Sequence, residues 1–201
     1  MPESANELTE LLRALATREA AATPTVTLGT VTGQQIVELA FWPGTDEAVS
    51  ADLLRIAGVA LPETGGRALR SGGTTAFRVG PRRVWLAAPE AAHLGEALLD
   101  SLSKHGALVP LGHARAILRL TGAAAADVLS EVLTIDLDPL AFPDGAFATT
   151  ALGRVGILVH RVGSVGGACA FDLYLPRSYA QWLASLVIKA AEPYGVAADV
   201  A

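Results

Sequence analysis

The stretch RAILRLTG, residues Arg115 to Gly122, opens the most informative part of the chain. Apolar and polar side chains alternate along it, which is typical of a half-buried β-strand, and a turn glycine ends it. The alanine-rich residues 123–133 then predict a helix, and residues 146–151, 155–162 and 169–175 predict three strands. A long amphipathic helix follows Ser178. This half of the chain is therefore predicted to have the order βαβββα.

The preceding half predicts the same order of elements. Residues 35–42 are expected to form a strand and residues 46–57 a helix. Strands follow near 67–71, 74–79 and 84–87, and a helix spans 89–105. The two halves share little sequence identity, so the repeat is inferred from element order alone. We expect an α+β fold with mainly antiparallel sheets and helices packed on them.

The domain boundaries follow from these elements. Residues 1–25 are expected to form an N-terminal helix and linker, because Leu8, Leu11, Leu12 and Leu15 share one helical face and residues 20–25 are small. Residues 26–201 are expected to form a single domain, with halves at about 34–106 and 113–195. The short helix needs a surface to pack on, either its own domain or a partner.

Composition limits the possible functions of the chain. Of its 201 residues, 51% are hydrophobic and 17% charged, so a sizeable core is expected. Soluble domains carry about 25% charged residues, and the shortfall indicates that a partner covers part of the surface, unless abundant alanine alone inflates the hydrophobic count. The net charge of −5 argues against nucleic-acid binding. We expect no membrane span or secretion signal, and the single cysteine indicates the reducing cytoplasm.

The residues that could carry chemistry form no recognised motif. The histidines are His93, His105, His113 and His160, and none has metal-ligand spacing with Cys169. Cys169 is expected to be a buried structural thiol. Asp136, Asp138 and Asp144 are close in sequence, but turn formation explains them as well as acid–base chemistry does. The glycines at 153–156 and 163–167 predict hairpin turns. We therefore assign no catalytic, cofactor-binding or metal-binding residue.

Three tryptophans are the candidate interface residues. Trp42, Trp85 and Trp182 fall at apolar positions of their predicted elements and could anchor either the core or a partner. On the last helix, the side chains expected to be buried are Tyr179, Trp182, Leu183, Leu186, Val187 and Ala190.

An ordered set of short motifs resembles the gamma subunit of heterotetrameric sarcosine oxidase. The set comprises Leu61-Pro62, Gly80-Pro81, Trp85-Leu86, Arg115 to Gly122, Asp136-Leu137, Phe142-Pro143 with Gly145, Thr149-Thr150, and Phe171 through Arg177-Ser178. The resemblance extends from about Gly58 to Gly195. The chain departs from the family pattern at Arg82-Arg83-Val84, which lengthens the gap before Trp85. The N-terminal 25 residues have no counterpart in that pattern.

The resemblance implies a fold like the folate-binding domain of glycine-cleavage aminomethyltransferase. It also implies a non-catalytic subunit that acts in assembly and stability of a cytoplasmic flavoenzyme complex, which oxidatively demethylates sarcosine. The partners would be larger alpha and beta subunits and a small delta subunit. FAD, FMN, NAD and tetrahydrofolate would lie in those partners. No catalytic residue is carried over to this chain.

Two alternatives remain open at this point. The first is a freestanding folate-binding protein of the aminomethyltransferase or iron–sulfur-repair type, which would need an acidic residue to hold the pterin ring and a pocket of several hundred Å³. The second is a generic oligomeric scaffold. Folate binding to the isolated chain would identify the first, and co-purification with a flavin-bearing subunit would exclude the second.

Overall fold

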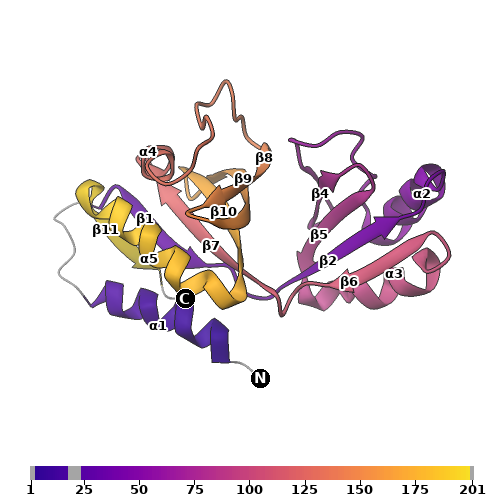
Figure 1. The fold of residues 1–201 in the computed structure, drawn as a ribbon, viewed down its shortest axis with the longest axis horizontal. Coiled ribbons are helices and arrows are strands. Elements are labelled where there is room, and N and C mark those ends of the chain that lie inside the picture. The colour runs from indigo at the N-terminus through magenta and orange to yellow at the C-terminus, as the bar shows by residue number, and fades with distance from the viewer. Residues whose placement is uncertain (1–2, 18–23, 200–201) are drawn as a thin grey trace. The chain divides into compact units, whose positions relative to one another are not determined.

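The computed structural model describes residues 3–17 and 24–199, which form two compact units (Figure 1). Unit 1 comprises residues 1–32 and 114–201, and unit 2 comprises residues 33–113. Each unit has its own sheet and its own buried apolar cluster. Unit 2 is thus an insertion between the first strand of unit 1 and the rest of that unit.

Unit 2 is a five-stranded antiparallel sheet with two helices on one face. Its strands, in spatial order, are β3 (Leu69–Ser71), β4 (Thr74–Gly80), β5 (Arg83–Pro89), β2 (Gln34–Phe41) and β6 (Gly106–Pro110). Its helices are α2 (Asp46–Ala57), the 3-10 turn η1 (Glu90–Ala92) and α3 (Leu94–Leu102). Alternate side chains of the central strands, such as Leu39 and Leu86, pack against Leu53 of α2 and Leu98 of α3.

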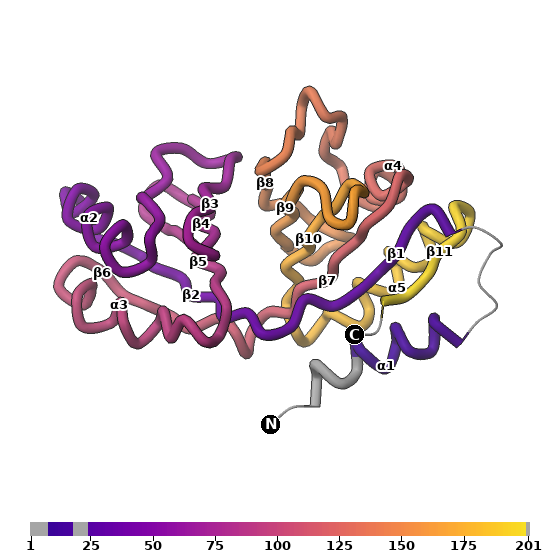
Figure 2. The backbone as a smooth tube through the Cα atoms, turned by 180° about the vertical axis from the view of Figure 1, so that it is seen from behind, coloured from indigo at the N-terminus to yellow at the C-terminus, as the bar shows by residue number. Residues whose placement is uncertain are grey.

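Unit 1 is built on a six-stranded sheet. Its strands, in spatial order, are β11 (Val196–Asp199), β1 (Val26–Thr30), β7 (Arg115–Gly122), β10 (Ala168–Pro176), β9 (Val155–Val165) and β8 (Phe147–Leu152). All neighbours are antiparallel except β1 and β11, which run parallel side by side although they lie at opposite ends of the chain (Figure 2). Its helices are α1 (Glu3–Ala16), α4 (Ala125–Ser130), η2 (Arg177–Tyr179), α5 (Ala180–Ala191) and η3 (Glu192–Tyr194).

The predicted fold class is confirmed, because each unit contains the order βαβββα with largely antiparallel strands. Three short strands were not predicted: β1, β6 and β11. None has more than five residues, and the side chains of β6 and β11 are mostly exposed or partly buried, although Val26 and Leu28 of β1 are buried. Their pairing depends on segments distant in sequence, which local alternation does not reveal.

The N-terminal helix belongs to unit 1 and is not a separate segment. Leu8, Leu12 and Leu15 are at most 8% exposed and join the apolar cluster of that unit. Helix α1 lies against α5 and β11 (Figure 1). The chain's own domain therefore covers the apolar face of α1. The predicted linker falls largely on residues 18–23, which lie outside the described part of the chain.

Gly122 is required by close backbone packing. It is the last residue of β7 and pairs with Val26 of β1, with a φ of 135°. A Cβ atom there would overlap the carbonyl oxygen of Thr25 and approach the Val26 Cα to 2.9 Å. Glycine therefore permits β1 to lie against β7, which a larger residue would prevent.

Candidate functional site

Helix α5 and the η2 turn before it carry the most exposed aromatic side chains of unit 1, and the buried face of this segment differs from the predicted one. Leu183 and Val187 are buried as expected, but Tyr179 and Trp182 are 52% and 48% exposed. The remaining side chains that face the core are Ala180, Ala184, Ile188 and Ala191. These alanines let the helix approach the sheet closely. The helix is apolar around most of its circumference, so periodicity alone could not identify the buried face.

The outward face of α5 borders an apolar groove of about 610 Å³ within unit 1. The lining residues come from the end of α4, the β8–β9 turn and the C-terminal part of α5: Glu131, Val132, Leu152, Gly153, Leu186, Lys189, Ala190, Pro193 and Tyr194. Two charged side chains of opposite sign, Glu131 and Lys189, are among them. An apolar groove of this kind can accept a hydrophobic side chain or a short segment of another protein.

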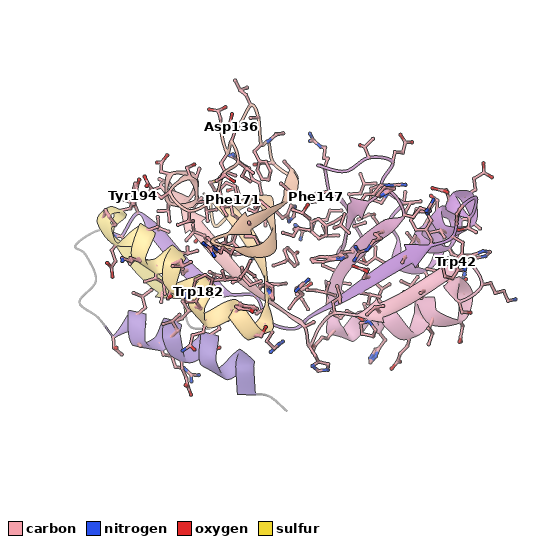
Figure 3. All side chains as sticks on the ribbon, viewed as in Figure 1. Trp42, Asp136, Phe147, Phe171, Trp182 and Tyr194 are labelled. Atoms are coloured by element: carbon pink, nitrogen blue, oxygen red, sulfur yellow. The ribbon has the colours of Figure 1, made fainter. Side chains whose placement is uncertain are left out.

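Trp182 lies beside this groove, because Gly153 of the β8–β9 turn is next to the edge of its ring. Gly153 has a φ of 62°, and a Cβ atom built on it would lie 3.1 Å from Cη2 of Trp182. The same hypothetical atom would lie 3.8 Å from Cδ1 of Leu186. Figure 3 shows Trp182 on α5 and Tyr194 just beyond its C-terminal end. Trp182 thus adjoins Gly153, which lines the groove, and we call Tyr179, Trp182, Leu186 and the groove together the α5 surface.

The other two tryptophans lie in unit 2, in different environments. Trp42 follows β2 in the turn before α2 and is 52% exposed. Trp85 is 8% exposed in the central strand β5, and its indole N–H donates to Oε2 of Glu38 at 2.7 Å. Arg83 also binds this carboxylate. Trp42 therefore has the exposure that the interface prediction needs, whereas burial leaves Trp85 little surface to offer a partner.

An ion pair between a partly buried arginine and a buried aspartate crosses the sheet of unit 1, and the sequence analysis did not identify it. Arg119 of β7 and Asp172 of β10 are direct neighbours in the strand register. The Nε and Nη2 atoms of Arg119 donate to the two carboxylate oxygens of Asp172 at 2.6 and 2.8 Å. These hydrogen bonds raise the pKa of Arg119 above its ordinary value. The sequence signal was a lone aspartate within the apolar run Ala170 to Leu175.

His160 extends this polar row, because it is the register partner of Asp172 on β9 and is only 6% exposed. The other histidines lie elsewhere. His93 is exposed before α3 with its Nδ1 3.8 Å from Glu96, His105 lies before β6, and His113 is exposed at the end of unit 2. The structure therefore brings one of the four histidines close to a buried carboxylate.

The three clustered aspartates support a loop. Asp136 accepts a hydrogen bond from the Asp138 backbone N–H at 2.9 Å, and Asp138 accepts one from that of Leu140 at 2.8 Å. Asp144 accepts from Nε of Arg161 at 3.0 Å. Each carboxylate thus has a local structural partner, which favours the turn interpretation.

Cys169 was expected to be buried but is only partly buried, and the glycine-rich segments include hairpin turns. Burial raises the pKa of the Cys169 thiol, which disfavours the thiolate that a nucleophile needs. Gly153 lies in the β8–β9 turn, and Gly166 and Gly167 lie in the β9–β10 turn, as predicted, whereas Gly156 and Gly163 lie within β9. Over the described residues, no cluster of three metal-binding side chains is found, and no helix there is long and apolar enough to cross a membrane.

Comparisons with known proteins identify related sequences. No family model matches the chain. It is 34% identical over 115 residues to sarcosine oxidase subunit gamma of Corynebacterium sp. (strain P-1), covering 56% of this chain and 57% of that protein. It is 28% identical over 153 residues to the subunit of the same name from Arthrobacter sp., covering 75% and 74%. The aligned region thus spans little more than half of the first relative and about three quarters of the second.

Solved structures agree with these sequence matches. A chain of the heterotetrameric sarcosine oxidase from Corynebacterium sp. U-96 superposes with a TM-score of 0.82 at 29% identity, covering 97% of both chains. Aminomethyltransferase T of the glycine cleavage system from Bartonella henselae gives a TM-score of 0.60 at 18% identity, covering 94% of this chain and 50% of that one. The second likeness concerns the fold alone, and it confirms the predicted relation to the aminomethyltransferase fold.

Proposed function

We propose that this chain, a homologue of sarcosine oxidase gamma subunits, is the gamma-type subunit of a heterotetrameric sarcosine oxidase complex. The single observation that carries this proposal is the superposition on a chain of such a complex over 97% of both chains. This likeness covers both units. It includes the region before Gly58, in which no motif resembled the family. The role we assign is assembly and stability, without catalysis by this chain.

The positions of the chemical groups support a structural role. The buried carboxylate among the described residues, Asp172, has both oxygens engaged by Arg119. The clustered aspartates hold a loop, and burial disfavours ionisation of Cys169. A folate-binding variant of this fold would need a carboxylate available to the pterin ring. Asp172 does not fit that requirement, because breaking its pairing would leave a charged Arg119 without its partner.

The proposal assigns the redox chemistry to partner subunits. Larger alpha and beta subunits and a small delta subunit would hold FAD, FMN, NAD and tetrahydrofolate and demethylate sarcosine in the cytoplasm. The α5 surface and Trp42 are the parts of this chain that we propose to meet those partners. Exposed aromatic side chains are enriched among the residues that dominate binding energy at protein interfaces.

Co-expression tests the proposal directly. The chain is produced with the flavin-bearing large subunits, one of which carries an affinity tag, and the purified complex is examined for flavin absorbance and sarcosine oxidation. We expect the chain to co-purify in fixed proportion and the complex to turn over sarcosine. The chain purified alone should bind neither flavin nor folate. Sarcosine turnover by the single chain, or its absence from the purified complex, would refute the proposed role.

A further inference from the structure

The loop between α4 and β8 holds one leucine almost fully in water. Leu140 is 95% exposed, whereas Leu137 and Phe142 of the same loop are 2% and 6% exposed and join the core of unit 1. Figures 1 and 2 both show this loop extending beyond the edge of the sheet, and Asp136 marks it in Figure 3. Two apolar side chains therefore anchor the loop, and the third points to solvent.

The backbone around Leu140 is held in place by hydrogen bonds. The N–H of Leu140 donates to Oδ1 of Asp138, and the N–H groups of Ala141 and Phe142 donate to the Asp138 carbonyl at 3.0 and 2.7 Å. A single exposed leucine is ordinary on a protein surface. Here, however, the loop has a defined conformation that keeps Leu140 from turning back into the core.

Arg161 of β9 anchors the base of the loop. Its Nη1 donates to the carbonyl of Phe142 at 3.2 Å, its Nε donates to Asp144, and its guanidinium lies 5.5 Å from the ring centroid of Phe171. The side chain of Arg161 is only 12% exposed, so this anchor is shielded from water. Its positive charge pairs with the carboxylate of Asp144, so Asp136 and Asp138 are the carboxylates of the loop that it does not bind.

The charge around Leu140 is negative. Asp136 and Asp138 are exposed, and residues 134–146 contain no lysine, arginine or histidine, while the third carboxylate, Asp144, is paired with Arg161. A complementary surface would be an apolar pocket with a basic rim. A second copy of this chain fits poorly, because its net charge is −5 and one acidic and one basic side chain, Glu131 and Lys189, line its α5 groove.

We propose that loop 136–146 is a preformed docking element that inserts Leu140 into an apolar, basic-rimmed pocket of a larger subunit in the complex. This inference rests on the proposed function for its partner. Because the loop is already ordered, binding would cost little conformational entropy. Leu140 would supply affinity, and the aspartates would speed association and fix its orientation.

Competitive assembly is the test. A tagged flavin-bearing subunit is co-expressed with equal doses of wild-type chain and one variant, and mass spectrometry measures the share of each in the purified complex relative to total expression. We expect Leu140→Asp to be depleted about tenfold or more. Leu54→Asp on α2 is the matched control, since Leu54 is 59% exposed, and it should compete equally. Equal incorporation of Leu140→Asp would overturn the inference.

A second variant separates the acidic rim from the leucine. Asp136→Asn with Asp138→Asn keeps the acceptor oxygens of both turns and removes two charges, so the loop should stay folded. We expect a smaller depletion, and a complex whose assembly responds less to added salt than that of the wild type. If assembly responds equally to salt in both proteins, the inference that the partner's pocket has a basic rim is overturned.

Two further outcomes distinguish the possible failures. If the wild-type chain is itself absent from the purified complex, the proposed function is wrong. The larger subunit is then also excluded as the partner of Leu140. If the wild-type chain alone runs as a dimer in gel filtration and Leu140→Asp runs as a monomer, the occupant is a second copy and the inference is wrong. Equal melting temperatures of wild-type and Leu140→Asp chains would confirm that the substitution leaves the fold intact.

Discussion

At the scale of single residues, charged side chains in this chain act mainly as structural links. Arg119 and Asp172 join two strands, Arg161 fastens a loop, and Glu38 receives the indole N–H of Trp85. In each case a charged or polar partner offsets the free-energy cost of removing the charged group from water. The low content of charged residues therefore makes each buried one structurally important.

The Arg119–Asp172 pair gives the first prediction. Asp172→Ala should lower the free energy of unfolding by about 3 kcal/mol, because it leaves Arg119 partly buried without its partner. Urea denaturation followed by circular dichroism measures this change. The double substitution Arg119→Met with Asp172→Leu should recover most of the loss, since it removes both charges together.

An exposed pair serves as the control for this measurement. Arg55 donates to Asp52 at 2.7 Å, and its side chain is 62% exposed. Arg55→Ala should change stability by no more than about 1 kcal/mol. A loss in Asp172→Ala as small as that in Arg55→Ala would mean that the cross-strand pair is not effectively buried.

At the scale of secondary-structure elements, the position of glycines and the faces of helices decide the packing. Gly122 lets β1 lie against β7, and alanines on α5 let that helix approach the sheet. Small residues at these contacts allow the elements to come close, while Leu183 and Val187 fill the core beside them. Trp182 lies outside this buried face and is half exposed.

Gly122→Ala is the second prediction. The substitution places a Cβ atom against the backbone of Thr25 and Val26 at a φ of 135°, so it should destabilise unit 1 by about 1–3 kcal/mol or more. Thermal unfolding measures the effect. Gly156→Ala in β9, where a Cβ atom would meet nothing within 4 Å, is the matched control and should leave the melting temperature nearly unchanged. Equal melting temperatures of the two variants would contradict the close β1–β7 contact.

Trp182→Ala is the third prediction. Trp182 is 48% exposed, so the isolated chain should lose no more than about 1–2 kcal/mol, whereas incorporation into the complex should fall clearly. Leu183→Ala, at a fully buried neighbour, should instead cost about 2–5 kcal/mol. Gln181→Ala, at an exposed position, should affect neither property.

Melting temperature and co-purification together distinguish these cases. A large loss of stability in Trp182→Ala would mean that the side chain supports the core. Unchanged co-purification would remove the α5 surface from the proposed interface.

At the scale of the whole molecule, chain order ties the two units together. Residues 1–32 contribute α1 and β1 to unit 1, and the chain then forms all of unit 2 before it returns near His113. Strand β1 pairs with both β7 and β11, so unit 1 cannot complete its sheet without the segment that precedes unit 2. This connectivity supports our proposal that residues 26–201 behave as a single domain.

Cleavage of the chain near Gly112 gives the fourth prediction. A protease site inserted there should yield two fragments that still co-migrate in native gel filtration, because β1 and α1 of the first fragment remain packed in unit 1. They should separate only in denaturant. Spontaneous separation into two stable fragments would contradict a single domain.

The uncut chain, heated under the same conditions, is the control for this experiment. It should unfold in one calorimetric transition. Two resolved transitions would mean that the units unfold independently.

The sequence by itself determined the fold class, the repeated βαβββα order and the structural interpretation of the aspartates, glycine turns and Cys169. These features depend on local spacing and turn chemistry, which a short window contains. Tertiary structure alone decided the strands β1, β6 and β11, the Arg119–Asp172 pair, the buried face of α5 and the exposure of Leu140. Each of these depends on contacts between residues far apart in the chain, and local pattern cannot specify which of several apolar faces finds a partner.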